Sequence, residues 1–220
     1  MTAALDIDDV LRAYSYGLFP MAESAQDPEI HWYDPPMRCQ LPLENLHVPR
    51  RLRETALKMP FEIRVDSDFA GVVAGCAEAT PKRPGTWINE GIRDLFVRLY
   101  EAGHAHSVEC WKDGLLVGGV YGLALGGAFS GESMFSRKPN ASKIALIHLC
   151  ARLRRGGFTI LDAQFTNPHL LQFGAYEIPR SEYLSRLHRA LAKKVNFQLA
   201  GVPEESLLRE YLNALPRSLP

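Results

Sequence analysis

The sequence predicts an α+β protein: a mixed β-sheet with helices packed on it, preceded by a smaller N-terminal lobe. From Phe61 onward, the expected elements follow in the order strand, helices, hairpin, strand, helix, strand, helix, which is typical of a mixed sheet covered by helices. Hydrophobic residues make up 46% and charged residues 23% of the 220 residues, which is ordinary globular usage and excludes a disordered or fibrous class. We expect a small lobe over residues 1–60, a main domain over residues 61–194 and a C-terminal tail over residues 195–220.

The N-terminal lobe is expected to contain two short helices. Asp6 or Asp8 can cap the first, which Gly17 ends. Residues 31–44 are rich in proline, so any strands there should be short and lie at sheet edges. Pro49 suits the first turn of the second helix, over residues 49–59.

The main domain begins with alternating residues 61–67, which predict a strand, and continues with a helix over residues 68–79 and a loop over residues 80–88. Asn89 can cap a helix that runs to Ala102. The remaining expected elements are a hairpin at 106–125 turning at Asp113-Gly114, a strand at 128–133, a helix at 140–155, a strand at 159–164 and a helix at 181–193.

The charge and cysteine content exclude several classes of protein. Lys and Arg together number 25, as do Asp and Glu, so no global field attracts polyanions and any nucleic-acid contact must use a local patch. The four cysteines are 34 to 40 residues apart, without a CxxC pair, which favours reduced thiols. We expect no signal peptide, no membrane span and a cytoplasmic location.

Three polar residues are candidates for chemistry. Asp162 and Gln164 lie on one face of the strand 159–164, because side chains alternate along a strand. A carboxylate beside an amide suits acyl transfer to nitrogen, although a solvated strand face has the same pattern. Glu132 ends an apolar strand system, so it should have a cationic partner, a hydrogen-bond shell or access to solvent.

Apolar residues near these groups could line a pocket. Leu146, Leu149 and Leu153 form one stripe of the helix 140–155, which is either core or the wall of a pocket for an apolar side chain. Val120 and Phe129 would come from adjacent strands.

Other constellations are weaker. His104 and His106 lack a third ligand nearby, so we expect no metal, and Ser130 does not sit in a GxSxG elbow. A patch of cations beside Trp87 could contact single-stranded nucleic acid through phosphates and stacking. Its members are Arg50, Arg51, Arg53, Lys82 and Arg83.

Eight spaced motifs closely resemble the leucyl/phenylalanyl-tRNA–protein transferase family. They are YGLFPM (16–21), GTWI (85–88), GHAHSVE (103–109), LVGGVYG (116–122), GESMFSR (131–137), NASK (140–143), LDAQ (161–164) and EIPR (177–180). The resemblance implies transfer of Leu or Phe from aminoacyl-tRNA to proteins that begin with Arg or Lys, which marks them for proteolysis. It also implies a main domain similar to the GCN5-related N-acetyltransferase fold and no cofactor.

The resemblance also implies roles for individual residues. Asp162 and Gln164 match the family's proposed catalytic pair, Glu132 lies close to it, and Trp87 matches the platform for the terminal adenine of tRNA. The matching pocket positions are Met21, Val120, Phe129, Leu146, Leu149, Leu153 and Leu161. We expect Glu132 and Asp162 together to form a negative mouth for a basic amino terminus, or else Glu132 to form an ion pair with Arg137.

Two other functions remain open at the level of the sequence. An acyl-CoA N-acyltransferase on the same fold would use a glycine-rich turn for pyrophosphate, whereas the corresponding loop here reads RKPNAS. A non-catalytic adaptor for basic amino termini would need Glu132 but not Asp162 and Gln164.

Overall fold

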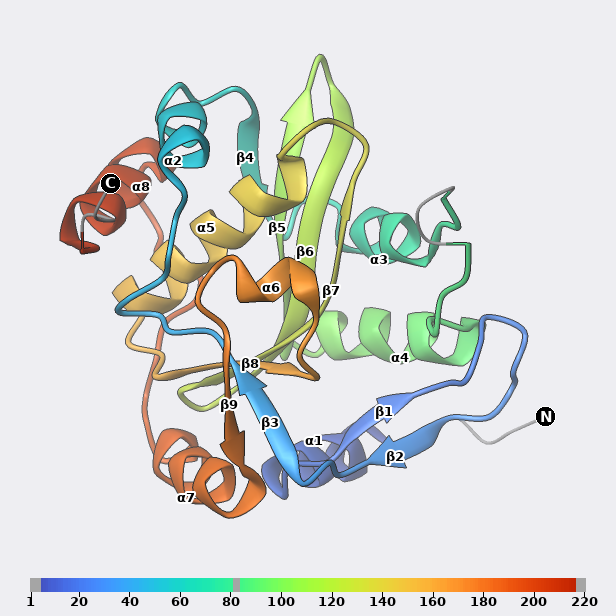
Figure 1. The fold of residues 1–220 in the computed structure, drawn as a ribbon. Coiled ribbons are helices and arrows are strands. Elements are labelled where there is room, and N and C mark those ends of the chain that lie inside the picture. Colours follow the sequence, from blue (N-terminus) through green and yellow to red (C-terminus); the bar gives the residue numbers. More distant parts are fainter. Residues whose placement is uncertain (1–4, 81–83, 217–220) are drawn as a thin grey trace.

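The computed structural model describes residues 5–80 and 84–216, which form a two-stranded sheet and a seven-stranded sheet with helices packed around them (Figure 1). The helices are α1 (Ile7–Ser15), α2 (Arg50–Leu57), α3 (Phe69–Ala77), α4 (Glu90–Glu101), α5 (Ala141–Arg155), α6 (Pro168–Leu171), α7 (Arg180–Leu191) and α8 (Glu204–Ala214). The strands are β1 (Phe19–Met21), β2 (His31–Tyr33), β3 (Met37–Gln40), β4 (Glu62–Val65), β5 (Ala105–Lys112), β6 (Leu115–Leu125), β7 (Ala128–Ser136), β8 (Ile160–Gln164) and β9 (Tyr176–Pro179). The mixed α+β architecture predicted from the sequence is confirmed.

The large sheet has the strand order β4-β5-β6-β7-β8-β3-β9. Its pairs are antiparallel except β7 and β8, which run parallel. The β5–β6 hairpin turns at Asp113-Gly114 as expected, and both residues have the positive φ that a tight two-residue hairpin turn requires. Because β7 and β8 are parallel, α5 must cross between them, and this crossover brings α5 onto the sheet.

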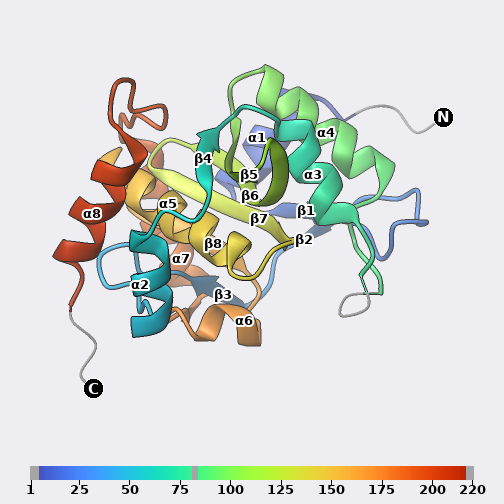
Figure 2. The same ribbon diagram turned by 90° about the horizontal axis from the view of Figure 1, so that it is seen from above.

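Helices cover both faces of the sheet, and Figure 2 shows the strands between them. One core joins α5 and α8 to the sheet, and the other joins α3 and α4 to its opposite face. The start of α5 presses closely on β6, where an added Cβ at Gly118 would lie 2.5 Å from the Cβ of Ala141. Glycine at 118 therefore allows the first turn of α5 to reach the sheet.

Residues 195–220, expected as a tail, include α8, which packs against α5. Leu207, Leu208 and Leu212 are buried there, and Tyr211 donates a hydrogen bond of 2.8 Å to the Leu43 carbonyl. The sequence shows the helical spacing of these leucines, but only the structure shows that they pack against α5.

Strand β3 was expected at a sheet edge but lies between β8 and β9. The expectation was wrong because Pro36 and Pro42 flank the strand rather than interrupt it. All four residues of β3 therefore keep the N–H groups that an interior strand needs. β3 also belongs to the large sheet although it falls within the expected small lobe, and the division at residue 60 remains a prediction.

Among the described residues, no helix combines the length and apolarity needed to cross a bilayer. All four cysteines are buried, and none forms a disulfide bond.

Candidate active site

A cavity opens where β7 and β8 separate. Their parallel pairing ends at Ser130 and Asp162; beyond this point β7 continues along β6, while β8 pairs with β3. The cavity has a volume of about 640 Å³ and is lined by these strands, α5, α6 and the segment around Trp87. Glu132 lies 30 residues before Asp162 and 32 before Gln164 in the sequence, and all three residues reach this cavity.

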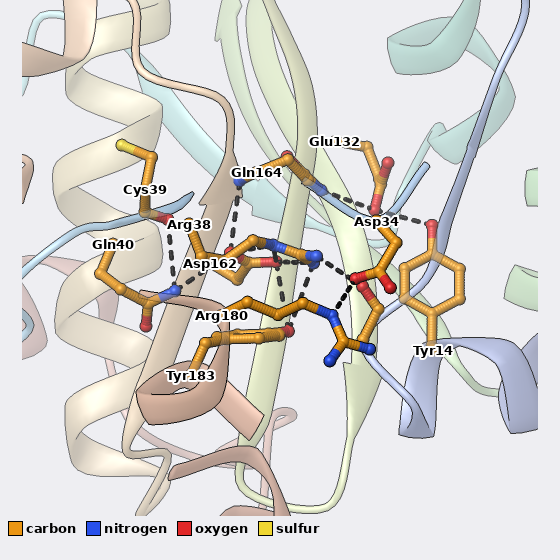
Figure 3. Close-up of polar contacts among 11 residues, drawn as sticks. Tyr14, Asp34, Arg38, Cys39, Gln40, Glu132, Asp162, Gln164, Arg180 and Tyr183 are labelled. Carbon is orange, nitrogen blue, oxygen red and sulfur yellow. Dashed lines mark hydrogen bonds and ion pairs between the residues drawn. The ribbon is translucent and has the colours of Figure 1, made fainter. Parts of the chain in front are cut away.

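Asp162 is fully buried and held by three side chains from two elements, β3 and α7 (Figure 3). Arg38 of β3 donates from Nε to Oδ1 at 3.1 Å and from Nη2 to Oδ2 at 2.6 Å. Gln40 donates to Oδ1 at 3.0 Å, and Tyr183 of α7 donates to Oδ2 at 3.4 Å. Arg38 also donates to the Gly17 carbonyl, so it ties the N-terminal lobe to the sheet. The hydrogen-bond capacity of Asp162 is thus largely used within the protein.

The buried Arg38–Asp162 pair is ionised. Burial raises the pKa of Asp162, and the charge of Arg38 opposes that rise. Because a guanidinium does not lose its proton in proteins and here donates directly to the carboxylate, the pair exists as two opposite charges. The pair therefore has no net charge, and the expected mouth of two free carboxylates is wrong.

Glu132 has a hydrogen-bond shell rather than a cationic partner. Its Oε1 accepts from the Tyr14 hydroxyl at 2.9 Å and from Gln164 Nε2 at 3.2 Å. The alternative partner, Arg137, instead pairs with Glu78. Burial raises the pKa of Glu132 to about 8, so at neutral pH this side chain is mostly a neutral acid.

The end of β8 has an uncommon backbone conformation. Gln164 has φ +55°, in the left-handed region that a residue with a Cβ seldom adopts. This conformation turns its backbone N–H towards Asp162 Oδ1, at 3.3 Å. Its Nε2 is held by Glu132, and among the described residues its Oε1 has no donor. Gln164 therefore presents a fixed hydrogen-bond acceptor, and strain of this kind is common at functional sites.

Most of the predicted pocket residues lie together. Trp87, Val120, Leu146, Leu149 and Leu161 line the cavity. The structure adds apolar residues that the sequence did not single out for the pocket, among them Leu41, Met134, Phe135 and Leu170.

Three predicted pocket residues lie elsewhere. Phe129 is fully buried, stacked on Phe197 with ring centroids 5.6 Å apart. Leu153, also fully buried, lies one turn of α5 beyond Leu149 in the same core. Met21 packs against the core on the opposite face of the sheet. Phe129 lies where β7 and β8 are still paired, so no gap opens beside it.

The predicted basic patch is only partly described. Arg50, Arg51 and Arg53 lie on α2, which packs against α8 and does not reach the cavity wall. Arg50 pairs with Glu54 at 3.0 Å. Lys82 and Arg83 lie outside the described residues, so the patch remains a prediction.

Sequence reasoning missed four side chains of the polar network: Tyr14, Arg38, Gln40 and Tyr183. A weak signal existed for two of them, because Arg38 and Gln40 are spaced by two in a short strand and so share a face. Nothing local distinguishes Tyr14 and Tyr183 from ordinary core aromatics.

The cavity combines an apolar wall, an indole, a fixed amide oxygen and an acid whose pKa lies near neutrality. Such a set can hold an acyl group and a flat ring, orient an amine and exchange a proton with it.

Comparison with known proteins gives consistent matches along most of the chain. Residues 40–188 match the family described as leucyl/phenylalanyl-tRNA protein transferase, and residues 3–36 match the N-terminal domain of that transferase. A protein of this name from Paramagnetospirillum magneticum is 57% identical over 193 residues, covering 88% of this chain and 92% of the relative. Another from Phenylobacterium zucineum is 54% identical over 204 residues, covering 93% and 92%.

Proposed function

The chain belongs to the leucyl/phenylalanyl-tRNA–protein transferase family, and we propose that the cavity between β7 and β8 is where it transfers the aminoacyl group. The protein is an aminoacyltransferase, which moves Leu or Phe from aminoacyl-tRNA to the N-terminal Arg or Lys of acceptor proteins. The observation that carries the placement is the convergence of Glu132, Asp162 and Gln164 on one cavity with an apolar wall.

The proposal includes a fold similar to the GCN5-related N-acetyltransferases. The parallel pair β7 and β8 within an otherwise antiparallel sheet, with α5 crossing between them, supports it. The division into residues 1–60, 61–194 and 195–220 and a cytoplasmic location belong to the same proposal.

The donor occupies the two ends of the cavity. Trp87 stacks on the terminal adenine, and the side chain of Leu or Phe enters the apolar wall formed by Val120, Leu146, Leu149 and Leu161. This places the ester near Gln164 and Glu132. The ester is already activated, so the protein mainly has to hold the ester and the amine in an attack geometry.

The acceptor amine approaches Gln164. The free Oε1 of Gln164 accepts a hydrogen bond from the amine, and Asp162 fixes the backbone of Gln164 in its strained conformation. The positive charge of the acceptor first draws the proton off Glu132, and the ionised carboxylate then takes one proton from the ammonium, because the two groups have similar pKa values. The amine nitrogen then bonds to the carbonyl carbon, the ester C–O bond breaks, and the second amine proton passes to the departing ribose oxygen.

A transfer assay tests the function and its side-chain preference. With an Arg-starting peptide, tRNAs charged with Leu, Phe or Met should all serve as donors, because an apolar pocket separates similar side chains by only about 1–3 kcal/mol. Val and Ile should react poorly because they branch at Cβ. The mass added to the peptide measures this, and preference for Asp- or Lys-charged tRNA would contradict the apolar pocket.

A second prediction concerns the basic patch. Replacing Arg50, Arg51 and Arg53 with Ala should lower tRNA affinity and reduce the slope of log Kd against log salt by about one to two. The same should hold for replacing Lys82 and Arg83. As a control, Arg186→Ala removes an arginine of α7 that pairs with Glu182 at the spacing of Arg50 and Glu54. If the patch variants showed the same salt slope as the control, the patch would be excluded as a tRNA-binding site.

A further inference from the structure

The N-terminus of α5 borders the cavity with unused hydrogen-bond donors. The helix has 15 residues, its capping residue Asn140 makes no side-chain hydrogen bond, and its first turn contains no acidic residue. The first N–H groups of a helix have no partner within the helix. Here the N–H of Ser142 donates to Ser136 Oγ at 3.2 Å, whereas among the described residues the N–H of Lys143 has no acceptor.

The side chain of Ser142 is the second, independent observation. It is 7% exposed and lines the cavity. Among residues 5–80 and 84–216, its hydroxyl has no hydrogen-bond partner. Because Ser142 lines the cavity and its hydroxyl has no partner among the described residues, the hydroxyl can donate to a ligand bound there. Ser142 stands one turn before Leu146 and two turns before Leu149, so the apolar wall ends in a polar group.

The charges around this helix end favour an anion. Arg137 is offset by its ion pair with Glu78. Within the described part of the chain, Lys138 and Lys143 have no ion-pair partner, and Lys143 Nζ donates to the neutral amide of Gln172 at 2.8 Å. The positive end of the helix dipole adds to these two charges.

We propose that the N-terminus of α5, through the Ser142 hydroxyl and the Lys143 N–H, binds the phosphodiester that joins the terminal adenosine of the donor to the preceding nucleotide. The inference rests on the proposed function. Trp87, Gln164 and Ser142 line one cavity, so with the adenine at Trp87 this phosphate is the nearest anion of the donor. Backbone and hydroxyl donors bind a phosphate whichever bases it joins, so tRNAs that carry different amino acids can use the same site.

The phosphate contact can be tested apart from the rest of the site by comparing three aminoacyl donors. Phenylalanyl-adenosine has no phosphate, and phenylalanyl-cytidylyl-adenosine has one phosphodiester. The third donor is phenylalanyl-tRNA. Ser142→Ala should lower kcat/KM about tenfold for the two phosphate-bearing donors, the loss of one charged hydrogen bond. It should leave phenylalanyl-adenosine within about twofold. Ser181→Ala is the matched control, because Ser181 is also the second residue of a helix without a side-chain cap but is exposed on α7.

Ser142→Asp gives a second readout that misfolding cannot imitate. The helix dipole favours a carboxylate at this position, and continued reaction with phenylalanyl-adenosine should show that the variant is folded. The phosphate-bearing donors should nevertheless react about a hundredfold more slowly, through repulsion.

Equal losses for all three donors, or no loss for any, would overturn the phosphate site while leaving the transferase intact. If the unmodified protein used none of the donors, the proposed function would fail and the phosphate site with it.

Discussion

Asp162→Asn should reduce kcat/KM for aminoacyl transfer by about a hundredfold or more and also destabilise the fold. The activity falls because the neutral side chain no longer matches the donors of Arg38 that hold it in place, and so does not fix the backbone of Gln164. The stability falls because Arg38, which is 1% exposed, loses its counterion. Breaking one partner of a buried pair typically costs about 3–5 kcal/mol. Transfer kinetics and urea unfolding measure the two effects separately.

The double variant Asp162→Asn/Arg38→Met separates catalysis from stability. Removing the arginine as well removes the unpaired charge, so more than half of the lost stability should return. Transfer should remain slow, because the carboxylate that orients Gln164 is still absent. Recovery of activity together with stability would show that Asp162 serves the fold alone.

Glu132→Gln should remove the preference for a charged first residue in the acceptor. Before the acceptor binds, Glu132 is mostly protonated. A basic side chain that binds beside it favours the ionised form, and the ion pair that results offsets the free energy of ionising Glu132. Peptides beginning with Arg and with its neutral isostere citrulline measure this contact. In the unmodified protein we expect kcat/KM to favour Arg by about ten- to a hundredfold. In the variant the ratio should approach one, and an unchanged ratio would remove Glu132 from acceptor recognition.

The same substitution should change how stability depends on pH. The pKa of Glu132 is about 8 in the folded protein, above its ordinary value of 4.5. The folded state therefore binds this proton more tightly, and the resulting stabilisation is complete below about pH 4 and lost as the pH rises through 8. Gln cannot ionise and keeps an oxygen to accept from Tyr14 and Gln164. The variant should gain stability relative to the unmodified protein by about 4 kcal/mol between pH 5 and 8.5. A constant difference would show that Glu132 titrates normally.

Local patterns accounted for much of the fold. The Asp113-Gly114 turn, the helix capped by Asn89 and the crossover helix after Asn140 all lie where the sequence indicates. These features depend on residues close in the chain, through turn conformations, capping and periodicity. Strand β9 and helix α8 were not predicted, because their stability comes from β3 and α5, which are far from them in the sequence.

The sequence by itself determined the fold class, the family resemblance and the three polar residues Glu132, Asp162 and Gln164, because each follows from composition, from motif spacing or from the two-residue period of a strand. Only the tertiary structure decided what these residues can do. It brings Arg38 from 124 residues away onto Asp162, so that the pair is neutral, and it brings Tyr14 from 118 residues away onto Glu132. A side chain's charge state depends on the groups and the solvent that surround it in space. Those surroundings are set where β7 and β8 separate, a point that no local pattern marks.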